Sequence, residues 1–221
     1  MPEINYNEIV DVITKNVKEV IEQKLKNIPD KSYCIPVEIS VRHIHLTREV
    51  LDILYGKDYQ LKKIRDLSQP GEFASAETVT IVGPKMRAIE NVRILGPLRN
   101  FTQVELSRTD GIYLGIDLPL RLSGDIKGSA PITVIGPKGS IYLNEGAIRA
   151  ARHIHMTPDD AKKFNVKDKQ IVKVEIPGDC GVILDNVIVR LSDKFKLALH
   201  LDTDEGNCAN AQPTTMAKII L

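Results

Sequence analysis

Two copies of the tripeptide His-Ile-His stand out among the residues that could do chemistry. Residues 42–47 read RHIHLT and residues 152–157 read RHIHMT, so these segments hold four of the five histidines. Residues i and i+2 of a strand project from the same face, and each segment therefore presents two parallel imidazoles. The two imidazoles of such a pair can bind the same divalent metal ion. A third ligand from a neighbouring strand would leave one position open, as in a catalytic zinc site.

An internal repeat supplies the third ligands. Aligning Asn91-Val92 with Asn186-Val187 places Glu105 opposite His200, the fifth histidine. A single inward-facing histidine is often a hydrogen-bonded core residue, but two matched copies that use every histidine of the chain favour metal binding. The repeat therefore predicts one site formed by His43, His45 and Glu105 and a second formed by His153, His155 and His200.

The elements that must position these residues are mainly β. Short β-branched runs bounded by Gly, Pro, Asn and Asp, from residues 34–45 to 185–192, predict a sandwich or barrel. The period of two predicts that His43 and His45 continue an inward-facing stripe formed by Val37, Ile39 and Val41. Residues 46–56 and 156–166 each follow a His-Ile-His and predict short helices, with Thr47 and Thr157 as N-caps and Pro158 at the first helical position.

The start of the chain has a different pattern. Residues 8–26 carry apolar side chains at helical spacing with a charged opposite face, which predicts an amphipathic helix that Asn7 can cap. We expect three regions: 1–31 as the helix and its linker, 32–142 as the first half and 143–221 as the second half, with the two halves intertwined.

Composition excludes several classes of function. Lysine plus arginine (30) nearly balance aspartate plus glutamate (29) and tryptophan is absent, which argues against a nucleic-acid or membrane partner. The apolar runs are shorter than a bilayer span, and acidic residues interrupt the N-terminal apolar stretch, unlike a secretory signal. The three distant cysteines form no disulfide framework and no CxxC knuckle, and Cys208 near His200 is interpreted as an incidental thiol. A reduced cytoplasmic protein is expected.

The remaining polar residues leave a choice open. Arg99 lies six residues before Glu105, so on a continuous strand the two share a face, and its side chain could hold phosphate bidentately or form a surface ion pair. No phosphate loop, dinucleotide fingerprint or GxSxG elbow is present. The two predicted metal sites together use all five histidines, so none is left to act as a base. A serine or cysteine nucleophile with a histidine base is therefore disfavoured.

From about residue 35 to the C-terminus, the chain resembles the phosphate propanoyltransferases, the PduL-type phosphotransacylases. The resemblance is carried by VRHIHLT, QPGEFASAETVTIVGPK, NVRILGPLRNFTQVELSRTD, ARHIHMTPDDA and HLDTDEGN. It implies two similar, intertwined β-barrels capped by short helices, with two zinc ions per chain between them. It also implies the reversible reaction of acyl-CoA with phosphate to give acyl phosphate and CoA.

Matching positions carry the family's site residues over. The first site would face the CoA sulfur and the second would hold the more hydrated ion. Arg99 matches the phosphate-binding arginine. The positions that match the CoA site are Ser40, Val41, Lys85, Arg93 and Asn207.

Some features remain open after the resemblance. Family members include proteins of bacterial microcompartments, as in propanediol degradation, where a short N-terminal helix targets the enzyme to shell or cargo proteins. Residues 8–26 could do this or could dock on a barrel. Propanoyl-CoA is the expected acyl donor, and a second copy of the chain is among the candidate partners. Competing functions are a dinuclear zinc hydrolase, although no aspartate lies in the repeated ligand frame, and a metal-binding structural protein, which would leave Arg99 without a role.

Overall fold

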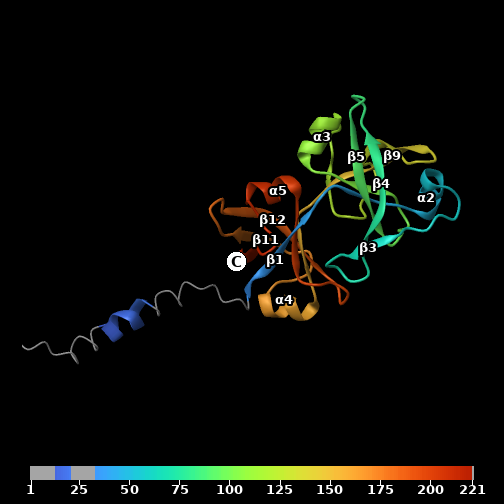
Figure 1. Ribbon diagram of the computed structural model, residues 1–221. Coiled ribbons are helices and arrows are strands. Elements are labelled where there is room, and N and C mark those ends of the chain that lie inside the picture. Colours follow the sequence, from blue (N-terminus) through green and yellow to red (C-terminus); the bar gives the residue numbers. More distant parts are fainter. Residues whose placement is uncertain (1–12, 21–32, 221) are drawn as a thin grey trace, which may run out of the picture. The chain divides into compact units, whose positions relative to one another are not determined.

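A computed structural model describes residues 13–20 and 33–220 (Figure 1). The chain divides into two compact units, Met1–Cys34 and Ile35–Leu221, and each is considered by itself. In the first unit, residues 13–20 are helical, which confirms a helix within the expected segment. The rest of that segment, including the proposed cap Asn7, lies outside the described residues.

The second unit is mainly β and contains two closed six-stranded barrels. The first barrel runs in the ring order β2-β6-β9-β8-β4-β5, and the second in the order β1-β13-β10-β12-β11-β14. The strands of the first are β2 (His43–His45), β4 (Phe73–Val82), β5 (Ala88–Gly96), β6 (Gln103–Glu105), β8 (Ala130–Ile135) and β9 (Ser140–Ala150). Those of the second are β1 (Ile35–Ser40), β10 (His153–Met156), β11 (Ile171–Ile176), β12 (Val182–Leu191), β13 (Ala198–Asp202) and β14 (Met216–Ile220). Two further short strands pair with members of the first barrel: β3 (Lys63–Asp66) is antiparallel to β4, and β7 (Leu120–Arg121) is parallel to β9.

The chain crosses between the barrels immediately before each His-Ile-His. Strand β1 precedes β2 in sequence but pairs with β13 and β14 of the second barrel. In Figure 1 it lies in blue among the orange and red C-terminal strands. Strand β9 precedes β10 but pairs with β6 and β8 of the first barrel. Each histidine pair therefore lies where one barrel's chain enters the other.

This crossover interrupts the inward-facing stripe that the sequence predicted, and the histidines do not continue it. The strand ends at Ser40 and a new strand begins at His43, and Val41 between them is 58% exposed. Within the new strand, Ile44 is fully buried in the core of the first barrel, as Ile154 is in that of the second. Because neighbouring side chains of a strand alternate, the four imidazoles lie on the outer side of the barrel walls rather than in the cores.

Four short helices cap the barrels. The two expected helices are present as α2 (Arg48–Tyr55) and α4 (Pro158–Phe164), with Thr47 and Thr157 as N-caps and Pro158 in the first turn of α4. Helices α3 (Arg108–Leu114) and α5 (Thr203–Cys208) were not predicted, and each begins directly after a strand that carries a predicted third ligand. The helices found among the described residues are too short and too polar to cross a membrane.

Candidate metal and substrate site

The first predicted ligand set comes together on two paired strands. His43 of β2 lies opposite Glu105 of β6 in the antiparallel register, and His43 Nε2 is 3.6 Å from Glu105 Oε2. His43 Nδ1 lies 2.9 Å from the carbonyl oxygen of Val41. Since a carbonyl only accepts, this contact places the proton on Nδ1 and leaves Nε2 as a lone-pair donor. The ligand atoms of His43, His45 and Glu105 all lie within 4.8 Å of one another.

The second set repeats this arrangement in the other barrel. His153 of β10 lies opposite His200 of β13, and His153 Nδ1 is 2.8 Å from the carbonyl oxygen of Ala151. Ala151 occupies the position that Val41 has in the first half. The ligand atoms of His153, His155 and His200 also lie within 4.8 Å of one another. Both clusters therefore have the same construction and differ at the third ligand.

Burial keeps four of these imidazoles neutral. It is the largest cause lowering the pKa of His45 and His155 to about 2, and that of His153 and His200 to about 4. Neighbouring imidazoles lower these pKa values further in both clusters. At neutral pH these four rings therefore have the uncharged form that binds metals.

Orphaned nitrogen atoms test whether these residues fit a metal ion. Within residues 13–20 and 33–220, buried His45 Nδ1 and both ring nitrogens of His155 have no hydrogen-bond partner. A buried polar atom left without a partner costs about 1–3 kcal/mol. One cluster offers two imidazoles and a carboxylate, and the other offers three imidazoles. Catalytic zinc sites use three protein ligands of these kinds. The residues therefore fit two metal ions.

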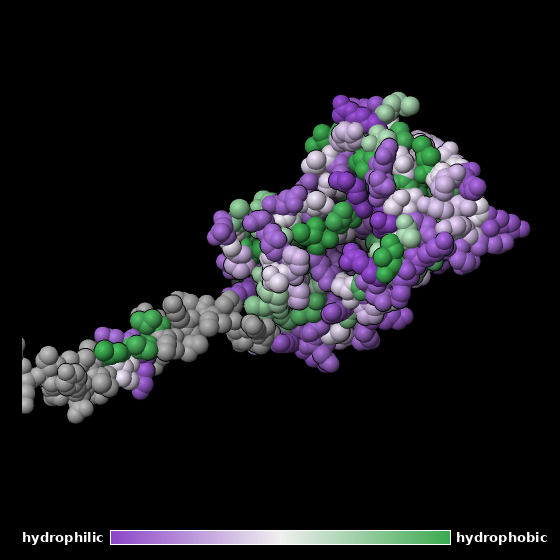
Figure 2. All heavy atoms as spheres, in the orientation of Figure 1, coloured by the Kyte–Doolittle hydropathy of each residue, from purple (hydrophilic) through white to green (hydrophobic). Residues whose placement is uncertain are grey.

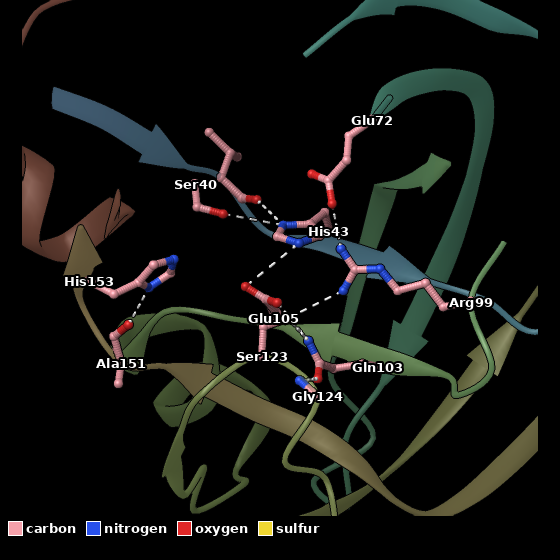
Figure 3. A network of polar contacts seen from close by, with 11 residues as sticks. Ser40, His43, Glu72, Arg99, Gln103, Glu105, Ser123, Gly124, Ala151 and His153 are labelled. Carbon is pink, nitrogen blue, oxygen red and sulfur yellow. Dashed lines mark hydrogen bonds and ion pairs between the residues drawn. The ribbon is translucent and has the colours of Figure 1, made fainter. Parts of the chain in front are cut away.

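A buried glutamine holds the carboxylate of Glu105 in place (Figure 3). Gln103 is fully buried, and its amide nitrogen donates to Glu105 Oε1 over 2.6 Å. Its amide oxygen accepts from the backbone N–H of Gly124 at 2.7 Å, which fixes the orientation of the amide. The other carboxylate oxygen, Oε2, is the one nearest His43. Sequence reasoning missed Gln103, although it lies two residues before Glu105 and so shares its face of the strand.

The arginine of each RHIH segment forms an ion pair with the helix that follows the predicted third ligand. Arg42 pairs with Asp110 of α3 through two contacts, 3.1 Å and 2.9 Å. Arg152 pairs with Glu205 of α5 at 3.1 Å. Both acids occupy the N3 position of a capping box and cap the helix as well. The repeat therefore joins each histidine strand to the helix after its partner strand.

Both clusters line one large cavity between the barrels, of about 1380 Å³. Figure 2 shows this face of the unit hollowed between the barrels, with many hydrophilic residues around the hollow. Gln69 of the first barrel's β3–β4 loop crosses to the second barrel, where its amide contacts both backbone groups of Lys196 at 3.1 Å and lies 3.4 Å from His200 Nε2. Gln69 thus connects the two barrels, and the two clusters lie on opposite walls of the same cavity.

Arg99 also lines this cavity and already has an acidic partner. Its guanidinium is 2.7 Å from Glu72 Oε1 and 3.3 Å from Ser123 Oγ. In Figure 3 the side chains of Arg99 and Glu72 point toward one another beside His43. The ion pair that the sequence left as an alternative is thus present, but inside the cavity rather than on the outer surface. An anion that reached Arg99 would share it with Glu72.

Comparison with known proteins gives this cavity a context. A sequence profile of the phosphate propanoyltransferase family matches residues 36–212. The chain belongs to the phosphate propanoyltransferase family. A phosphate propanoyltransferase of Priestia megaterium is 54% identical over 191 residues, covering 86% of this chain and 87% of the relative. Those of Lachnoclostridium phytofermentans and Thermotoga maritima are each 50% identical, over 90% and 91% of this chain and 92% and 93% of the relatives. The chain is an acyltransferase.

Within this family member, the expected CoA contacts do not all lie together. Ser40, Val41 and Arg93 line the central cavity. Lys85 lies in the β4–β5 turn, packed near Gly115, and Asn207 is exposed in α5; neither lines the cavity. Cys208, also exposed in α5, does not line it either. The roles of these residues stay predictions.

Proposed function

We propose that this family member is a zinc-dependent phosphate acyltransferase that interconverts acyl-CoA, with propanoyl-CoA as the expected substrate, and phosphate with acyl phosphate and CoA. The observation that carries the proposal is the meeting of two three-ligand clusters and Arg99 in one cavity. The names of the relatives, all phosphate propanoyltransferases, support the choice of reaction.

The two clusters would hold the ions as the sequence predicts, one on His43, His45 and Glu105 and one on His153, His155 and His200. When bound, zinc would supply a thiophilic Lewis acid for the CoA sulfur on one side and positive charge for the phosphate on the other. Assigning CoA to the first cluster follows from the resemblance. The neutral three-imidazole cluster suits the phosphate side because it brings no negative charge of its own.

The chain's own groups bind and orient the two reactants. Arg99 can hold phosphate through its planar fork, with Ser123 as a further hydrogen-bonding group at 3.3 Å. A phosphate oxygen then bonds to the thioester carbonyl carbon, and the carbon–sulfur bond breaks to release CoA. No cysteine lines the cavity in the described part of the chain. Direct attack between reactants held side by side gains its rate from positioning and needs no covalent enzyme intermediate.

An assay of thiol release separates the proposed function from its competitors. The purified protein is incubated with propanoyl-CoA, with and without phosphate, and free CoA is followed. Release that depends on phosphate is the expected result. Release without phosphate would mean hydrolysis, and no release under either condition would favour a structural metal-binding protein.

Metal content is the second expectation. Protein purified without added metal should contain about two zinc ions per chain, because each cluster offers three ligands in the catalytic pattern. Elemental analysis measures this directly. Dialysis against a chelator should remove the metal and the activity together, and zinc should restore both. Full activity in metal-free protein would contradict the assignment.

The N-terminal segment leads to a third expectation. If residues 8–26 target the enzyme to a microcompartment shell or cargo protein, deleting residues 1–27 should leave turnover near that of the intact chain. A docked structural helix would instead cover apolar surface, and its loss should lower the melting temperature by about 5 °C or more. Steady-state kinetics and a thermal melt of the truncated protein, compared with the intact chain, distinguish the two roles.

A further inference from the structure

A second arginine, which the sequence analysis did not single out, lines the central cavity. Arg190 lies on β12, directly beside His155 of β10 in the parallel register. Its guanidinium carbon is 5.8 Å from the centre of the Phe195 ring, and that ring stacks on His155 at 3.8 Å. Arg190 is thus held against the three-histidine cluster on the wall of the second barrel.

The repeat gives Arg190 no basic counterpart in the first barrel. His43 and Ile44 pair with Arg93 and Ile94, just as His153 and Ile154 pair with Ile188 and Val189. His155 then lies beside Arg190, whereas continuing the first pairing by one residue places Leu95 beside His45. Arg190 therefore lies beside only the cluster whose third member is neutral His200. The arginine beside the other cluster, Arg93, pairs with His43 and donates to the backbone carbonyls of Ser75 and Ala76. The cluster that contains the carboxylate of Glu105 has a leucine at this position.

Arg190 also lacks the counter-charge that Arg99 has. Among the residues described, no carboxylate oxygen lies within 4 Å of its guanidinium, whereas Glu72 lies 2.7 Å from that of Arg99. Glu105, Asp168 and Glu72 act on Arg190 only at longer range. Burial is the largest cause lowering its pKa, and the positive charge of Arg99 lowers it too. A half-buried guanidinium without a paired anion is costly.

The charge of Arg190 acts on all three imidazoles of the second cluster. After burial, it is the largest cause lowering the pKa of His200, and it also lowers the pKa of His153 and His155. A divalent ion on these rings would add to the positive charge there. Arg99 approaches the cavity from the first barrel and Arg190 from the second. The two arginines thus face the same cavity from opposite walls, Arg99 beside the first cluster and Arg190 beside the second.

We infer that Arg190 is a second phosphate-binding residue, which together with Arg99 clamps the inorganic phosphate substrate from the opposite barrel wall. The inference rests on the proposed function. A phosphate dianion has enough oxygens to accept hydrogen bonds from both guanidinium groups and to leave one oxygen free for the thioester carbon. Because Arg99 is shared with Glu72 and Arg190 is not, Arg190 offers the less compensated of the two charges.

The test compares Arg190→Met, Arg190→Lys and a control, Arg87→Met. Arg87 is an exposed arginine of the β4–β5 turn that does not line the cavity, so its variant removes the same charge elsewhere. Calorimetric titration with inorganic phosphate, without acyl-CoA, measures binding independently of turnover. Losing charge-assisted hydrogen bonds should weaken phosphate binding by about tenfold or more in Arg190→Met. Arg190→Lys should lose less, and Arg87→Met should bind like the parent protein.

Kinetics and zinc content complete the comparison. The KM for phosphate should rise with the dissociation constant, while the KM for propanoyl-CoA stays within about twofold and zinc content is unchanged. An unchanged phosphate affinity in Arg190→Met would overturn the inference, as would a rise confined to the KM for propanoyl-CoA, which would assign Arg190 to the phosphates of CoA. If Arg190→Met loses zinc, Arg190→Lys decides: unchanged phosphate affinity there overturns the inference. A parent protein without phosphate-dependent thiol release would instead contradict the proposed function.

Discussion

Replacing Glu105 with alanine is expected to abolish turnover, even at saturating phosphate, and to lower the zinc content from about two ions per chain to about one. Glu105 is the only carboxylate of its cluster and its side chain is 11% exposed, so the substitution removes one of three ligands and the only negative charge among them. Its loss also leaves the amide of buried Gln103 without the partner that it contacts at 2.6 Å. Metal affinity and ligand orientation thus fail together.

Two further variants make the Glu105 result specific. Glu105→Gln keeps the size of the side chain but removes the negative charge, and it should also lose zinc and activity. Glu175→Ala removes an exposed glutamate from β11, outside the cavity, and should keep both. Elemental analysis and initial rates with propanoyl-CoA and phosphate measure the outcomes. Two zinc ions and near-parent turnover in Glu105→Ala would refute the ligand assignment.

Arg99→Ala is expected to weaken the use of phosphate far more than the use of CoA, by about 2–4 kcal/mol of transition-state stabilisation. The side chain is 24% exposed and lies in the cavity, so its contacts with an anion are only partly screened by water. Its removal also leaves Glu72 as an unpaired negative charge facing the approaching phosphate. Both effects act in the same direction on phosphate.

Steady-state kinetics with each substrate varied in turn check this prediction. The KM for phosphate should rise and kcat/KM for phosphate should fall, while the KM for propanoyl-CoA changes little. Arg108→Ala is the control, because it removes an exposed arginine whose partner Asp117 is 97% exposed. Equal losses toward both substrates in Arg99→Ala, with phosphate binding unchanged, would show that Arg99 does not hold phosphate.

The helices show where local sequence was informative. Thr47 and Thr157 each precede an apolar helical pattern, and both were correctly predicted as N-caps. Helices α3 and α5 were missed, and each contains a glycine, which lowers helix propensity. Their capping boxes, Ser107 with Asp110 and Asp202 with Glu205, were the signal that could have revealed them.

Pairing between distant strands explains what the sequence could not predict. The period of two shows that His43 and His45 share a face, but it does not show which face is the core. The two histidines face away from the core, contrary to the prediction, because β1 closes the second barrel. It does so by pairing with strands that are more than 150 residues away in sequence. The same closure exposes Val41 and brings Arg190 and Glu72, which no motif had singled out, into one cavity.

The repeated strand motif with its matched third residue was enough to predict which residues form the two clusters, because that prediction needs only the period of a strand and the register of the repeat. Three further features can be seen only in the folded chain: the two clusters face one cavity, Gln103 orients Glu105, and Lys85 and Asn207 lie away from the cavity. These features depend on how two barrels close and on the link through Gln69. Barrel closure is set by long-range strand pairing, which local periodicity does not encode.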